Sequence, residues 1–148
     1  MNQIDNKSII LETNQYKIYV DNEKNTLFID IFKADYNKEL FFNGLEYIKN
    51  FWILANQNNK SFYQVFIFRE VKLYPFELYE TLFNTLKQLE NIFKTNLYGT
   101  CIVNDSNLID IFKPLFSMYK TVRPFQFVKT LDEGLDFIYK QSLPNNGA

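Results

Sequence analysis

The spacing of apolar residues switches several times between a period of two and a period of 3.6, and this switching limits the fold most. Segments 16–20 and 26–32 alternate apolar and polar residues, which is typical of half-buried strands. The polar run 21–25 between them contains no Gly, so it predicts a hairpin with a loop longer than two residues. The residues expected on the buried face of its second strand are Leu27, Ile29 and Ile31.

Three later segments also predict strands. Segments 63–68 and 98–103 are short and almost continuously apolar, as strands buried on both faces are. Segment 123–128 predicts a final strand, because Pro124 stands near its beginning, where a sheet tolerates proline.

Helical periodicity fills the intervals between these strands. From about 37 to 56, one apolar stripe contains Phe41, Leu45, Ile48, Trp52 and Ala55, and Phe42, Phe51 and Leu54 are expected to broaden its buried face. A second stripe, after Pro75 and ending before Asn96, contains Leu78, Leu82, Leu86, Leu89 and Phe93. A third contains Leu108, Ile111, Phe112 and Leu115, with Pro114 expected to kink it. The last begins at a capping box, Thr130 to Glu133, and contains Leu131, Leu135 and Ile138.

The element order is therefore β-β-α-β-α-β-α-β-α, which predicts an α/β fold. Strands separated by helices need crossover connections, so we expect a mixed, mostly parallel sheet of five strands with about four helices. The length of 148 residues suits one domain. We expect that domain to span 16–141, after a loosely ordered segment 1–15 and before a disordered tail 142–148.

Composition argues against several classes of function. A net charge of −1 is too weak to attract a nucleic acid. Histidine is absent, which removes His-dependent triads and most zinc sites. A single cysteine, no signal peptide and no apolar run long enough to span a membrane favour a cytoplasmic protein.

No residue set predicts catalysis or a bound cofactor. Cys101 stands in a predicted strand interior with no His to activate it, so we expect a small buried side chain. Asp105 and Asp110 are five residues apart and would not share a helix face. The four glycines form neither a dinucleotide nor a phosphate-binding motif. We therefore predict that the chain is not an enzyme and holds no metal or cofactor.

The predicted working surface lies where two interior strands end. Arg69 and Glu70 follow the first, with a solvated ion pair between them as the plainer interpretation. The turns expected beyond the two strands should lie at one end of the sheet and form a surface for another protein. The candidate residues of these turns are Tyr74, Pro75, Phe76, Glu77, Asn104, Asp105 and Ser106. The sequence also leaves open a homodimer.

The element order and length resemble the STAS family, the anti-sigma-factor antagonist-like domains. Segment 99–104 is similar to the fourth strand of that family, 119–125 to the approach to its fifth strand, and 130–138 to its closing helix. The resemblance covers about 16–140 and implies a regulatory domain that acts by protein contact. Regulatory members carry a phosphorylated Ser where the third strand meets the second helix. The corresponding segment 71–77 contains no Ser or Thr, so that switch is not carried over.

A second resemblance is to CRAL-TRIO lipid-transfer domains. Segment 101–104 followed by 112–116 is similar to a strand, a helix and a Lys-Pro-apolar stretch of that family. This resemblance implies that some of the 16 Phe and 10 Tyr line a pocket for a lipid or another small apolar ligand. The alternative is that these aromatic residues fill a core.

Overall fold

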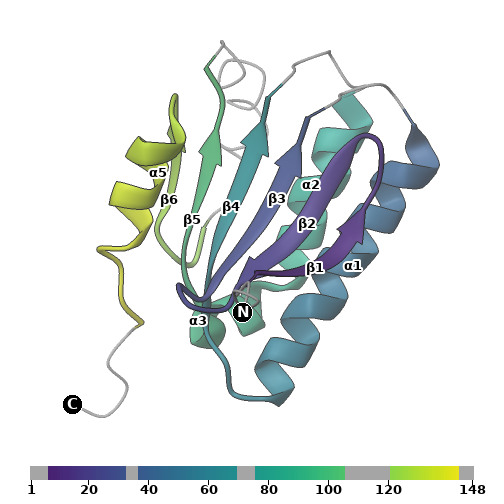
Figure 1. Ribbon diagram of the computed structural model, residues 1–148. Helices are drawn as coiled ribbons and strands as arrows, with labels where there is room; N and C mark the ends of the chain where they lie inside the picture. Colours follow the sequence, from purple (N-terminus) through teal and green to yellow (C-terminus); the bar gives the residue numbers. More distant parts are fainter. Residues whose placement is uncertain (1–6, 33–36, 70–75, 106–120, 144–148) are drawn as a thin grey trace, which may run out of the picture.

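The protein folds around one six-stranded sheet, seen in a computed structural model that describes residues 7–32, 37–69, 76–105 and 121–143 (Figure 1). The elements in chain order are β1 (Lys7–Glu12), β2 (Tyr16–Asp21), β3 (Thr26–Ile31), α1 (Lys38–Gln57), β4 (Phe62–Phe68), α2 (Phe76–Gln88), α3 (Glu90–Asn96), β5 (Leu97–Val103), β6 (Phe125–Val128) and α5 (Leu131–Ile138). The strands lie side by side in chain order. β1, β2 and β3 are antiparallel, and β3 to β6 are parallel. The predicted α/β class and mixed sheet are confirmed.

The number of strands was predicted wrongly, because β1 lies in the segment that we expected to be loosely ordered. Its register with β2 shifts between Ile9 and Leu11, which inserts an extra residue. Ile10 and Leu11 both pack against the core, so the period of two is broken within the strand. A pattern search for alternation therefore misses it.

The two faces of the sheet are covered by different helices. α1, α2 and α3 lie on one face, and α5 lies on the other over β4 to β6 (Figure 1). In β3, Leu27 and Ile29 belong to the core beneath the first three helices, whereas Phe28 belongs to the core beneath α5. β4 is buried on both faces, as predicted.

The predicted helix stripes are largely confirmed. Four of the five residues of the first stripe are buried in α1, and Phe41 is partly buried. Phe42 and Leu54 are 37% and 56% exposed, so the expected broader face was wrong at both positions. The second stripe is buried throughout, but the chain breaks at Leu89 into α2 and α3.

The N-cap predicted at Thr130 is confirmed, and Glu133 contacts the capping hydroxyl. The Thr130 hydroxyl accepts a hydrogen bond from the Glu133 backbone N–H and donates one to Glu133 Oε1, both at 3.2 Å. The helix predicted around residues 108–115, with its kink, lies outside the described residues. In the part of the chain that the structure describes, no helix has the length and apolar character needed to cross a bilayer.

Candidate functional site

A cleft opens at the carboxyl ends of β4, β5 and β6. These strands are parallel, so their ends meet at one edge of the sheet. After β4 the chain enters α2 on one face, whereas after β6 it enters α5 on the other (Figure 1). Open α/β sheets bind ligands in crevices outside the carboxyl ends of their strands. The cavity measures about 290 Å³ and is lined by Ile67, Phe68, Arg69, Val103, Asn104, Asp105, Lys129, Thr130 and Leu131. We call it the carboxyl-edge cleft.

Arg69 lies on the rim of this cleft and is held by β3. Its guanidinium donates two hydrogen bonds to the Asp30 carboxylate, Nε to Oδ1 at 2.7 Å and Nη2 to Oδ2 at 3.0 Å. This contact raises the pKa of Arg69, and the side chain remains 56% exposed. The ion-pair partner of Arg69 is thus Asp30. The sequence had suggested an ion pair with Glu70, and Glu70 lies outside the described residues.

Asn104 ties the ends of three strands together. Its side chain is buried, and Nδ2 donates to the Phe68 carbonyl oxygen at 2.7 Å. Its backbone N–H donates to the Val128 carbonyl oxygen at 2.9 Å. The next residue, Asp105, is exposed. Asn104 therefore shapes the cleft, and Asp105 offers a carboxylate at its rim.

Sequence reasoning missed Lys129 as a site residue and assigned Thr130 only to helix capping. Both directly follow β6 and are exposed, and Lys129 adds a second cation to the cleft. The signal that selected Arg69 and Asp105, a polar residue just past a strand end, would have selected these two as well.

The other predicted site residues do not join this cluster. Glu77 is exposed in the first turn of α2 and does not line the cleft. Phe76 is the first residue of α2, and the structure does not describe its side chain. Glu70, Tyr74, Pro75 and Ser106 lie outside the described residues.

Cys101 is not part of the cleft. Its side chain is fully buried beneath α5, and burial raises the pKa of the thiol to about 12. A thiol with this pKa stays protonated and is a poor nucleophile at neutral pH. Across the described residues, no three Cys, Asp or Glu side chains are grouped so that they could hold a metal ion.

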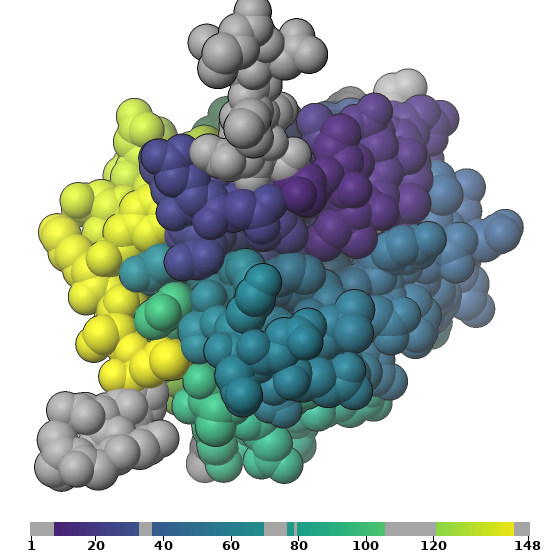
Figure 2. Space-filling view, turned by 60° about the horizontal axis from the view of Figure 1, so that its bottom comes forward, coloured from purple at the N-terminus to yellow at the C-terminus, as the bar shows by residue number. Residues whose placement is uncertain are grey.

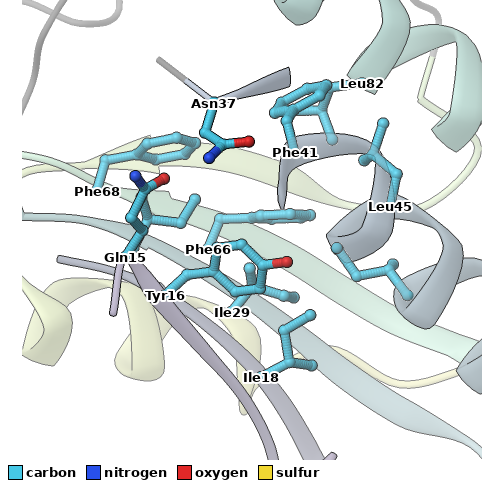
Figure 3. A pocket seen from close by; sticks show the side chains of 13 residues that line it. Gln15, Tyr16, Ile18, Ile29, Asn37, Phe41, Leu45, Phe66, Phe68 and Leu82 are labelled. Atoms are coloured by element: carbon cyan, nitrogen blue, oxygen red, sulfur yellow. The ribbon is translucent and has the colours of Figure 1, made fainter. Parts of the chain in front are cut away.

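A second, apolar pocket lies between the sheet and α1. Its volume is about 50 Å³, and the lining residues are Gln15, Tyr16, Ile18, Ile29, Ile31, Asn37, Phe41, Gly44, Leu45, Ile48, Phe66, Phe68 and Leu82. Figure 3 shows the amides of Gln15 and Asn37 near Phe68 at one end and Ile18 at the other. The Tyr16 hydroxyl at its wall donates to the Leu40 carbonyl oxygen at 2.7 Å.

No protein-family model matches this chain, and no curated protein matches it either.

Proposed function

We propose that this chain is a non-enzymatic, STAS-like regulatory domain that binds another protein at the carboxyl-edge cleft. The observation that carries the proposal is the convergence of Arg69, Asp105 and Lys129 around one concave site. These side chains come from the ends of three neighbouring strands and carry charges of both signs. Exposed charges around a recess are typical of the rim of a protein interface, where they set orientation and specificity.

The size of the cleft defines how a partner would use it. A stable interface covers roughly 800 Å² on each protein, so a cavity of about 290 Å³ would accept one side chain or the tip of a loop. The apolar residues among those that line the cleft, which include Ile67, Val103 and Leu131, suit an apolar anchor. The surrounding charges would then contact the polar surface beside that anchor.

The experiment is affinity capture of the full chain from its own cells with quantitative comparison of variants. The test variant combines Asp105→Lys with Lys129→Glu, which reverses two rim charges and leaves the net charge unchanged. The control combines Glu90→Lys with Lys94→Glu on α3, where the swap preserves the ion pair, now 3.6 Å long. We expect the first variant to lose the specific partner and the second to retain it. An identical partner list for both variants would remove the cleft as the binding site.

The apolar pocket favours a second candidate function, the binding of a small apolar ligand. A cavity of about 150 Å³ lined by Leu, Ile and Phe is known to bind benzene, and this pocket measures about 50 Å³. It would therefore accept a molecule of a few heavy atoms, whereas a lipid of the CRAL-TRIO type would need it to widen. Native mass spectrometry of protein purified from its source tests this candidate. A retained small molecule would support it, and an unliganded mass would contradict it.

A further inference from the structure

The apolar pocket beside α1 has one polar end. It lies between the first strands and α1, and Figure 2 shows these strands, in purple, lying beside that helix, in blue. Among the described residues that line the pocket, none carries a charge. The polar groups are the amides of Gln15 and Asn37 and the hydroxyl of Tyr16. Figure 3 shows both amides at the end beside Phe68. A molecule in this pocket would meet apolar surface at one end and hydrogen-bonding groups at the other.

The hydrogen bonds that these polar groups already make decide what they can offer a ligand. Asn37 is the N-cap of α1, and its Oδ1 accepts from the Leu40 backbone N–H at 3.1 Å. This contact identifies Oδ1, so the other atom of the amide is Nδ2, which only donates. The Tyr16 hydroxyl donates its hydrogen to the Leu40 carbonyl oxygen. Within the described part of the chain, neither Asn37 Nδ2 nor the side-chain amide of Gln15 makes a hydrogen bond. The polar end therefore offers N–H donors.

We propose that the pocket binds a small, uncharged molecule with an aliphatic body and one carbonyl group, whose oxygen accepts hydrogen bonds from Asn37 Nδ2 and from the Gln15 amide. A carbonyl oxygen has two lone pairs and can accept both bonds. A carboxylate is a poor ligand, because no described lining residue supplies a positive charge and removing an unpaired charge from water is costly. This inference rests on the second candidate function above, which requires only that the ligand be small and apolar.

The volume of the pocket limits the size of the molecule. One water-sized group needs about 10–15 Å³, so a volume of about 50 Å³ holds roughly three to five heavy atoms. Three probes of about this size form a matched set, namely 2-butanone, isopentane and propionate. They would present to the two amides a neutral carbonyl group, no polar group and a charged carboxylate, respectively.

Methyl NMR of the full chain measures the binding of each probe. The signals of Ile18, Leu45 and Ile48 report on the pocket, because these residues line it. We expect 2-butanone and isopentane to shift these signals in a saturable manner, and propionate at neutral pH to leave them unchanged. The hydrophobic effect drives isopentane from water more strongly than 2-butanone. The contribution of the hydrogen bonds is therefore measured by comparing protein variants.

Asn37→Asp removes the donor and keeps the cap, because Asp is as good an N-cap as Asn. We expect the affinity for 2-butanone to fall at least 2- to 10-fold, roughly the loss of one hydrogen bond, and the affinity for isopentane to change by less than about twofold. Gln15→Leu should show the same selectivity. The matched control is Asn43→Asp, which adds the same charge at an exposed position of α1 that does not line the pocket and should change neither affinity.

The outcomes separate this inference from the function on which it rests. If none of the three probes shifts the methyl signals, both the apolar-ligand function and the carbonyl preference are contradicted. If isopentane binds and 2-butanone does not, or if either folded variant leaves the affinity for 2-butanone unchanged, the carbonyl preference is overturned and the apolar-ligand function stands. Saturable binding of propionate would also overturn the preference. The dispersion of the methyl signals shows whether each variant is folded, and if one is not, the other decides.

Discussion

Replacing Gly134 with Ala should destabilise the protein through one contact with Cys101. Gly134 lies in α5, where a Cβ atom would approach Cys101 Sγ to 2.7 Å and Val128 Cγ2 to 3.1 Å. Both neighbours belong to the buried core beneath the helix. Sγ cannot retreat, because Cys101 is fully buried and its strand is paired on both sides. The helix must therefore move away from the sheet.

The size of the effect follows from two opposed contributions. Gly to Ala in a helix interior stabilises by about 1 kcal/mol, whereas forcing an extra methyl group into a packed core costs about 1–3 kcal/mol. We expect the free energy of unfolding to fall by about 1 kcal/mol, the difference between a mid-range strain of about 2 kcal/mol and the gain. For a chain of this length the melting temperature would fall by roughly 2–4 °C.

A double-mutant cycle isolates the contact. Cys101→Ala removes Sγ, so Gly134→Ala in that background should lose most of its cost and become neutral or slightly stabilising. Urea unfolding followed by fluorescence of Trp52, the only tryptophan and fully buried, measures all four proteins. Gly44→Ala is the control, because Gly44 faces Tyr16 from α1 and its effect should be the same in both backgrounds. If Gly134→Ala has the same effect with and without Sγ, the steric reasoning is wrong.

Three further predictions concern buried and exposed polar groups. Gln64→Leu should lower the free energy of unfolding by about 1–3 kcal/mol. The Trp52 indole N–H donates to Gln64 Oε1 at 2.8 Å and would be left without its acceptor. Urea unfolding measures this loss, and an unchanged urea midpoint would contradict the prediction. Folding raises the pKa of Cys101 from 9 to about 12, so its contribution to stability is complete below pH 9 and is lost as the pH rises toward 12. The free energy of unfolding of Cys101→Ala should therefore fall less steeply between pH 9 and 12 than that of the unmodified protein. Parallel pH dependences of the two proteins would contradict this prediction. Arg69→Ala should cost no more than about 1 kcal/mol, as exposed ion pairs do, and thermal unfolding at low and high salt should show its effect shrinking as salt screens the pair with Asp30.

The local sequence pattern was enough to predict burial wherever the burial of a residue depends on the periodicity of its own strand or helix. The alternation in β3 correctly placed Leu27 and Ile29 in one core, because successive strand residues point to opposite faces. The stripe in α1 was predicted correctly for the same kind of reason. β1 was missed because its bulge breaks the period of two, and a bulge depends on how the strand pairs with its neighbour.

The candidate site was only partly predictable. A polar residue following an interior strand was a sufficient signal for Arg69, Asn104 and Asp105, because parallel strands end at one edge. The contact between Arg69 and Asp30 joins residues 39 positions apart, and it depends on β3 and β4 being neighbours in parallel register. Strand order is set by how the helices pack, so this partner could not be identified from spacing.

The amino-acid sequence alone indicated most of the described strands and helices, β1 excepted, and most of their apolar positions, because those properties depend on periods of two and 3.6 residues along the chain. Only the tertiary structure decided that Lys129 joins Arg69 and Asp105 around a cleft, that Cys101 is covered by Gly134, and that β1 adds a strand beside β2. Each of these depends on contacts between separate segments of the chain, and such contacts exist only after the sheet has assembled and the helices have covered its faces.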